Sequence, residues 1–175
     1  MPCAVSSGVR VLALVPLTLL VARPLLGVEA CGGPLFLVER SANANVVVYE
    51  AHRLPSGALD ERRPVDVSWR LEDGRREDLS GLERAFVYGV VVRRASDAVR
   101  FTVRALPGRE LTLSAEGGCA RATTPISGQR AVLARVFVLL GRGTSVRSID
   151  LEGRDAATGE ALKERIEGAS LHASR

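Results

Sequence analysis

The sequence predicts an all-β fold, an antiparallel β-sandwich or partly closed barrel with one short helix, preceded by a signal peptide. Apolar and polar residues alternate with a period of two over much of the chain from Leu35 onward, which is the pattern of half-buried strands. The turns between these runs are short, so consecutive strands should pair antiparallel. The 175 residues, 46% hydrophobic and 25% charged, suffice for one globular core and not for two.

The N-terminus predicts an export signal. Arg10 precedes an apolar run, Val11–Val21, and the small residues around Ala30 suit signal peptidase. The run falls well short of the roughly 20 residues that a membrane-spanning helix needs. We therefore predict a signal peptide at 1–30, a single β-domain at 31–168 and a polar tail at 169–175, and expect the protein to be periplasmic or extracellular.

The elements of the domain follow from their local patterns. Val65, Val67 and Trp69 share one strand face, and a buried indole is the default for Trp69. Helical spacing of three and four in 79–86 predicts a short helix of at most two turns, capped by Asp78 or Ser80. The predicted strands are Leu35–Glu39, Val46–Ala51, Val65–Leu71, Phe86–Val92, Val99–Ala105, Leu111–Leu113, Ala131–Leu140 and Val146–Leu151, followed by a hairpin over Asp155–Ile166.

Cysteine use leaves two alternatives open. The chain has three cysteines, and removal of Cys3 with the signal leaves Cys31 and Cys119. Cleavage after Ala30 would make Cys31 the first residue, as in a lipoprotein, although Glu29 stands where such sites have a small or apolar residue. Cys31 either carries a lipid, which would be the protein's contact with a membrane, or pairs with Cys119 in an oxidising compartment.

Charge and composition argue against several function classes. The net charge is +4, and basic residues alternate with acidic ones instead of forming a stripe with aromatics, so we expect no nucleic-acid partner. Two distant histidines without a cysteine cluster predict no metal site, and no motif predicts a cofactor. No catalytic signature such as Gly-x-Ser-x-Gly is present, so no catalytic residue is assigned.

The densest polar cluster beside two predicted strands is Arg40, Asn43 and Asn45. A hairpin turn explains both asparagines, because Asn tolerates left-handed backbone and hydrogen-bonds its own chain. In the functional interpretation the three residues line a shallow site for a polar or anionic ligand, since a guanidinium matches carboxylates.

The predicted function is a non-enzymatic binding or structural module of the cell envelope, whose partner is an envelope protein or a polar ligand. The alternative is a small envelope hydrolase that uses a carboxylate or a histidine, with His52 beside the loop 54–57 as the histidine.

Several segments, in this order, resemble a family of exported bacterial proteins known as domain of unknown function 4833. The resemblance spans Leu35–Ile166 and leaves Ser114–Gln129 unmatched. It implies an exported protein and brings no activity, ligand or catalytic residue with it. The matching segments are Leu35–Arg40, Asn43–Tyr49, Pro64–Trp69, Leu82–Gly89, Ile149–Asp155, Thr158–Gly159 and Glu164–Ile166.

Overall fold

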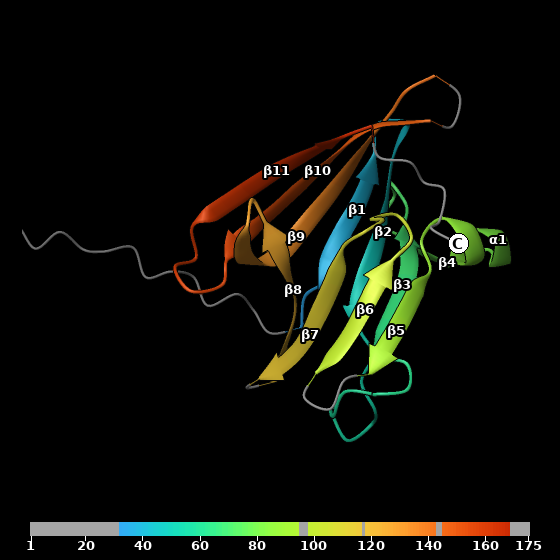
Figure 1. The fold of residues 1–175 in the computed structure, drawn as a ribbon. Helices are drawn as coiled ribbons and strands as arrows, with labels where there is room; N and C mark the ends of the chain where they lie inside the picture. Colours follow the sequence, from blue (N-terminus) through green and yellow to red (C-terminus); the bar gives the residue numbers. More distant parts are fainter. Residues whose placement is uncertain (1–31, 95–97, 117, 143–144, 169–175) are drawn as a thin grey trace, which may run out of the picture.

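The computed structural model describes residues 32–94, 98–116, 118–142 and 145–168, and there it contains eleven strands in one sheet and one short helix (Figure 1). The predicted all-β class is confirmed. The predicted signal peptide, Cys31 and the tail 169–175 lie outside the described residues. In chain order the elements are β1 Phe36–Arg40, β2 Asn43–Ala51, β3 Val65–Arg70, β4 Arg76–Asp78, α1 Gly81–Phe86, β5 Val90–Arg94, β6 Val99–Val103, β7 Glu110–Glu116, β8 Cys119–Ile126, β9 Gln129–Leu140, β10 Val146–Asp155 and β11 Ala161–Glu167.

The sheet forks along the long strand β9. Residues 129–132 of β9 pair with β8 and residues 135–138 pair with β1, while β10 pairs with the opposite edge over 131–140. Strands β8 and β1 therefore follow one another along a single edge of β9. One arm runs from β1 through β2 and β3 to β4, and the other from β8 through β7 and β6 to β5. The β1–β9 pair is parallel, and consecutive strands within each arm pair antiparallel as predicted.

The hydrophobic core lies between the two arms, which curl toward each other as a partly closed barrel (Figure 1). The ring of Phe36 on β1 stacks on Phe101 of β6 across this space, with 6.5 Å between centroids. The Tyr49 hydroxyl of β2 donates to the Tyr88 carbonyl, just before β5, at 2.8 Å. These contacts hold the two arms together across the core.

The helix α1 joins the ends of the two arms and begins as predicted. Ser80 is its N-cap in a capping box with Glu83, which satisfies backbone N–H groups at the first turn. Leu79 is buried as the spacing suggests, but Leu82 and Phe86 are 74% and 67% exposed. The predicted strand beginning at Phe86 is wrong at its start, because the helix includes Phe86 and β5 begins at Val90. Within the described part of the chain, no helix is long and apolar enough to cross a membrane.

Two strands were not predicted from the sequence. Strand β4 has three residues, all exposed, and so carries no alternating apolar signal. Strand β8 reads Cys-Ala-Arg-Ala-Thr-Thr-Pro-Ile, in which threonines and Pro125 replace the usual apolar row. Thr123 and Thr124 are nevertheless buried, since both hydroxyls donate to carbonyls of neighbouring β7. Hydrogen bonding to the neighbouring strand thus compensates for the polarity of β8.

Candidate functional site

Arg40 is the last residue of β1, and its half-buried side chain lies over aromatic rings of β3 and of the segment before β5. Its position on β1 follows Phe36 and Val38, which face the core, and the β1–β2 register shifts between Val38 and Arg40. The guanidinium carbon lies 5.0 Å from the ring centroid of Trp69 and 5.7 Å from that of Tyr88. We call the group formed by Arg40, Trp69, Tyr88 and the neighbouring Glu83 the aromatic notch.

The cation of the notch forms no salt bridge in the described part of the chain, and the Glu83 carboxylate acts on it only through its charge. Across the described ranges, Arg40 forms no salt bridge, and its buried Nε has no hydrogen-bond partner. The Tyr88 hydroxyl is likewise buried without a partner, in a residue only 2% exposed. Burial raises the pKa of Tyr88, an effect that the charge of Arg40 opposes. Arg40 is therefore held over two aromatic faces and makes no direct contact with an acid in the described residues.

Glu83 stands close to Arg40 but is engaged elsewhere. Its carboxylate accepts hydrogen bonds from the Ser80 N–H at 2.9 Å, the Ser80 hydroxyl at 2.8 Å and Trp69 Nε1 at 3.2 Å. The Ser80 N–H is the main cause that lowers the pKa of Glu83, and the charge of Arg40 adds to this lowering. The carboxylate thus fixes α1 against Trp69 and stays ionised at neutral pH.

The two asparagines do not line the aromatic notch. Asn43 is exposed and pairs with Arg40 across the β1–β2 hairpin. The side-chain oxygen of Asn45 accepts from the backbone N–H of Glu72 at 3.2 Å. Both therefore serve the hairpin and the neighbouring loop, and the structure brings Arg40 together with Trp69, Glu83 and Tyr88 instead.

The other cationic groups near the centre of the sheet pair with acids. Arg135 on β9 lies 2.6 Å from Glu39 and 3.4 Å from Glu152. Lys163 lies 2.9 Å from Glu152. The Arg135 pairs are half-buried, whereas the Lys163 side chain is exposed, and an exposed ion pair contributes little to stability. In these groups the acidic and basic side chains pair with each other, whereas the Arg40 guanidinium of the aromatic notch forms no salt bridge with the described residues.

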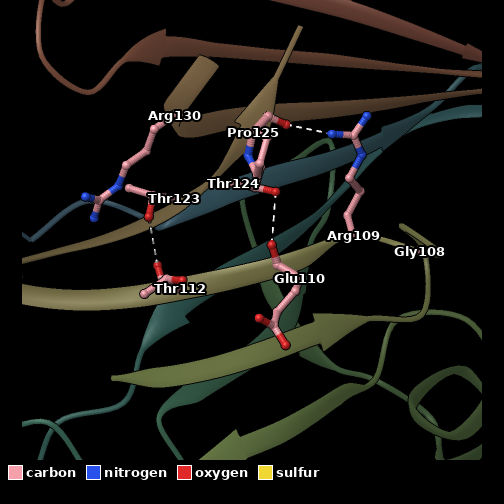
Figure 2. Close-up of a pocket in the computed structure, with 8 residues that line it drawn as sticks. All are labelled: Gly108, Arg109, Glu110, Thr112, Thr123, Thr124, Pro125 and Arg130. Atoms are coloured by element: carbon pink, nitrogen blue, oxygen red, sulfur yellow. Dashed lines mark hydrogen bonds between the residues drawn. The ribbon is translucent and has the colours of Figure 1, made fainter. Parts of the chain in front are cut away.

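A shallow hollow of about 600 Å³ lies elsewhere, over β7 and β8 (Figure 2). Three threonines and two arginines are among the residues that line it. The Arg109 guanidinium donates to the Pro125 carbonyl at 2.8 Å and pairs with Glu164 of β11. Among the described residues, the guanidinium of Arg130 makes no hydrogen bond or salt bridge. The residues used below to describe the hollow are Arg109, Glu110, Thr112, Thr123, Thr124 and Arg130.

His52 lies between two carboxylates at the end of β2. Its Nδ1 is 2.5 Å from Asp66, and its Nε2 is 3.8 Å from Asp60. Arg63 also pairs with Asp66, at 2.6 Å. Since both ring nitrogens face carboxylates, neither is directed at a hydroxyl or thiol that it could activate as a base.

Metal and cysteine chemistry have few candidates in the described part of the chain. No group of three or more His, Cys, Asp or Glu side chains there is arranged to hold a metal ion. Cys119, at the start of β8, is disulfide-bonded. The sequence-predicted alternatives for Cys31 concern a residue outside the described range.

Fold and site together define a forked, curled β-sheet protein in which Arg40 lies over two aromatic rings and forms no salt bridge with the described residues. The chain belongs to the family described as domain of unknown function (DUF4833), whose family model matches residues 36–165. No curated protein and no solved structure matches the chain. The family match agrees with the resemblance found in the sequence and covers both arms of the sheet and β9.

Proposed function

We propose that this chain is an exported, non-enzymatic binding module of the bacterial cell envelope, and that the aromatic notch binds a carboxylate or similar oxyanion of its ligand. The observation that supports this proposal is the guanidinium of Arg40, which lies over Trp69 and Tyr88 and makes no salt bridge or hydrogen bond with the described residues.

The physical argument concerns unmet hydrogen-bonding capacity. A guanidinium has five donors in a planar fork, and loss of water from a half-buried cation is costly unless an acceptor replaces it. Trp69 and Tyr88 offer the cation their faces and accept no conventional hydrogen bond from it. Glu83 already accepts three hydrogen bonds from Ser80 and Trp69. An incoming carboxylate can therefore pair with Arg40 in a bidentate manner.

The hydrolase alternative has less support. The side chain of His52 contacts Asp66 and Asp60 and so holds the β2–β3 connection in place. The backbone N–H of His52 also donates to the Pro64 carbonyl at 2.9 Å, which closes this connection. A binding role needs no nucleophile, and the notch supplies a fixed cation for it.

The test uses the fluorescence of Trp69, the single tryptophan of the chain and a wall of the notch. We expect acetate and succinate to change this fluorescence saturably, relative to chloride at equal ionic strength. The Arg40→Gln variant should lose the response, and Arg40→Lys should weaken it because lysine lacks the planar fork. Arg93→Gln, which removes an exposed arginine of β5, is the matched control and should respond as wild type. An unchanged titration in Arg40→Gln would refute the proposed site.

Export and the state of Cys31 are tested separately. If the signal is removed after Ala30, Cys31 is the one cysteine left to pair within the chain with the disulfide-bonded Cys119. We therefore propose a Cys31–Cys119 disulfide, which leaves no thiol for a lipid. The intact mass of the natively exported protein should equal that of chain 31–175 and rise by two hydrogens on reduction. An uncleaved N-terminus, or the mass of a diacylglycerol, would contradict this.

A further inference from the structure

The hollow over β7 and β8 carries an inference independent of the aromatic notch. We propose that it binds an acidic sugar unit, a molecule with several hydroxyl groups and one carboxylate. Its volume of about 600 Å³ falls within the usual range for small-molecule sites and far exceeds what a single simple ion fills. The class of ligand follows from the groups that line it.

The floor of the hollow consists of hydroxyl groups held by the sheet. Thr112 of β7 and Thr123 of β8 are register partners, and the Thr123 hydroxyl donates to the Thr112 carbonyl at 3.4 Å, near the limit for a hydrogen bond. The Thr124 hydroxyl donates to the Glu110 carbonyl at 3.0 Å. Thr124 is 2% exposed and lies on the same face of β8 as the core residues Ala122 and Ile126, so its hydroxyl bonds within the protein. The hydroxyl groups offered to a ligand are those of Thr112 and Thr123, whose oxygens keep lone pairs for a further donor. Such a floor suits the hydroxyl groups of a sugar.

One side of the hollow is rigid. Arg109 is fixed by the Pro125 carbonyl and by Glu164, whose other carboxylate oxygen accepts the Ser127 N–H at 2.6 Å. These contacts tie the turn before β7, the β8–β9 turn and β11 together. The wall is therefore formed before any ligand arrives, which lowers the entropic cost of binding.

The opposite side supplies a cation. Figure 2 shows Arg130 beside Thr123 and Thr112, away from Arg109. In the part of the chain that the structure describes, the Arg130 side chain has no acidic partner, so it is available to a ligand carboxylate. The nearest carboxylate of the lining, Glu110, points away from Thr124 and Pro125 in Figure 2 and lies 3.4 Å from Arg100. The hollow thus offers one unpaired positive charge beside a hydroxyl floor.

The experiment compares four probes with the oxidised, natively exported chain: glucuronate, glucose, acetate and inorganic phosphate. Amide shifts in ¹H–¹⁵N spectra report the site and the dissociation constant. We expect glucuronate to shift the amides of Thr112, Thr123 and Arg130 and to bind more tightly than each of the other probes. Equal or tighter binding of acetate or phosphate would show recognition of charge alone and overturn the proposal, as would glucuronate shifts confined to other residues.

Variants separate the two recognition elements. Arg130→Gln should weaken glucuronate binding by about tenfold, the loss of one charge-assisted hydrogen bond, and leave glucose binding unchanged. Thr123→Val, nearly isosteric, should weaken both sugars. The matched control is Arg121→Gln, which should bind as wild type. Arg121 is an exposed arginine of β8, two residues before Thr123. Wild-type affinity in Arg130→Gln would also overturn the proposal.

The result is distinguishable from a failure at the aromatic notch. The hollow contains no tryptophan, so its occupation is read from amide shifts and not from Trp69 fluorescence. Arg40→Gln should leave glucuronate shifts at Thr123 unchanged, and Arg130→Gln should leave the fluorescence response to acetate unchanged. Loss of the Thr123 shifts in Arg40→Gln would contradict two independent sites.

Discussion

Single residues explain why short motifs of this chain have the composition they do. Gly89 follows the buried Tyr88, and a Cβ placed on it would lie 1.8 Å from the carbonyl oxygen of Arg84. Gly153 on β10 meets a similar limit, since its Cβ would lie 2.4 Å from the Val132 carbonyl oxygen. In both places a backbone approaches another backbone so closely that a methyl group does not fit.

Two alanine substitutions at either end of α1 should have opposite effects. Gly89→Ala should destabilise the protein by about 1–3 kcal/mol, because the end of α1 must move away from the added methyl group. Gly81→Ala, in open space at the start of the helix, should stabilise it by about 0.4–1 kcal/mol. Urea unfolding measures both. Equal effects of the two variants would show that the close contact at Gly89 is not maintained in solution.

The charge of Glu83 should stabilise the fold in a pH-dependent way. Its pKa is lower in the folded protein than in the unfolded chain, mainly through the Ser80 N–H. The stabilisation is therefore complete above the ordinary glutamate pKa of about 4.3 and is lost as the pH falls through the lowered value. Glu83→Gln keeps the acceptor and removes the charge. Its stability deficit, from urea midpoints between neutral and acidic pH, should shrink in acid; a deficit independent of pH would disprove this.

The sequence predicted one member of the aromatic notch, and its limits are physical. Arg40 stood out as part of the densest polar cluster beside two predicted strands, but its partners come from β3, α1 and the segment before β5. Nothing in the order of residues shows that two aromatic faces and a carboxylate from those elements meet one arginine. The hairpin explanation of the asparagines fits only in part, because both lie within β2 and neither has the left-handed backbone that it invoked. The side chain of Asn45 accepts from the backbone N–H of Glu72, 27 residues further along the chain.

At the scale of elements, α1 shows that helical spacing does not determine which side is buried. Leu79 before the helix is 6% exposed, while Leu82 and Phe86 on it face outward. The Glu83–Trp69 hydrogen bond, at 3.2 Å, connects the helix to β3, while those two apolar side chains are exposed. A polar contact, invisible to a hydrophobic pattern, thus lies on the side of the helix that meets the sheet.

Truncation of the two leucines should separate these environments. Leu79→Ala should cost about 2–5 kcal/mol of unfolding free energy, as a buried cavity does. Leu82→Ala should change it by no more than about 0.5 kcal/mol. Urea unfolding of both variants measures the difference. A large loss in Leu82→Ala would mean that the exposed face of α1 is covered in solution.

At the scale of the whole molecule, strand alternation predicted the fold class and most strands, but not the fork. The pairing of β1 with β9 joins residues almost a hundred positions apart, and no local signal specifies it. The apolar length of β9 was visible, since its predicted range, 131–140, lies within the observed strand. The pairing of β9 with two strands on one edge and with a third strand on the other edge is determined by tertiary packing alone.

Because both arms share β9, the described domain should unfold as one unit. Leu133→Ala, at a β9 residue 1% exposed, should cost about 2–5 kcal/mol. Unfolding of this variant should be followed by Trp69 fluorescence, which reports the β3 arm, and by far-ultraviolet circular dichroism. We expect the two unfolding transitions to coincide. The exposed Leu54→Ala serves as the control. Two separated transitions would indicate arms that fold independently.

The position of β9 late in the chain has a consequence for the timing of folding. β1 ends at Arg40, yet its parallel partner β9 begins at Gln129. The first arm therefore cannot pair with β9 until three-quarters of the polypeptide has been synthesised. Such long-range pairing forms slowly. A nascent chain of this topology therefore keeps its first arm without its β9 neighbour until late in synthesis, and both arms then close on the same strand.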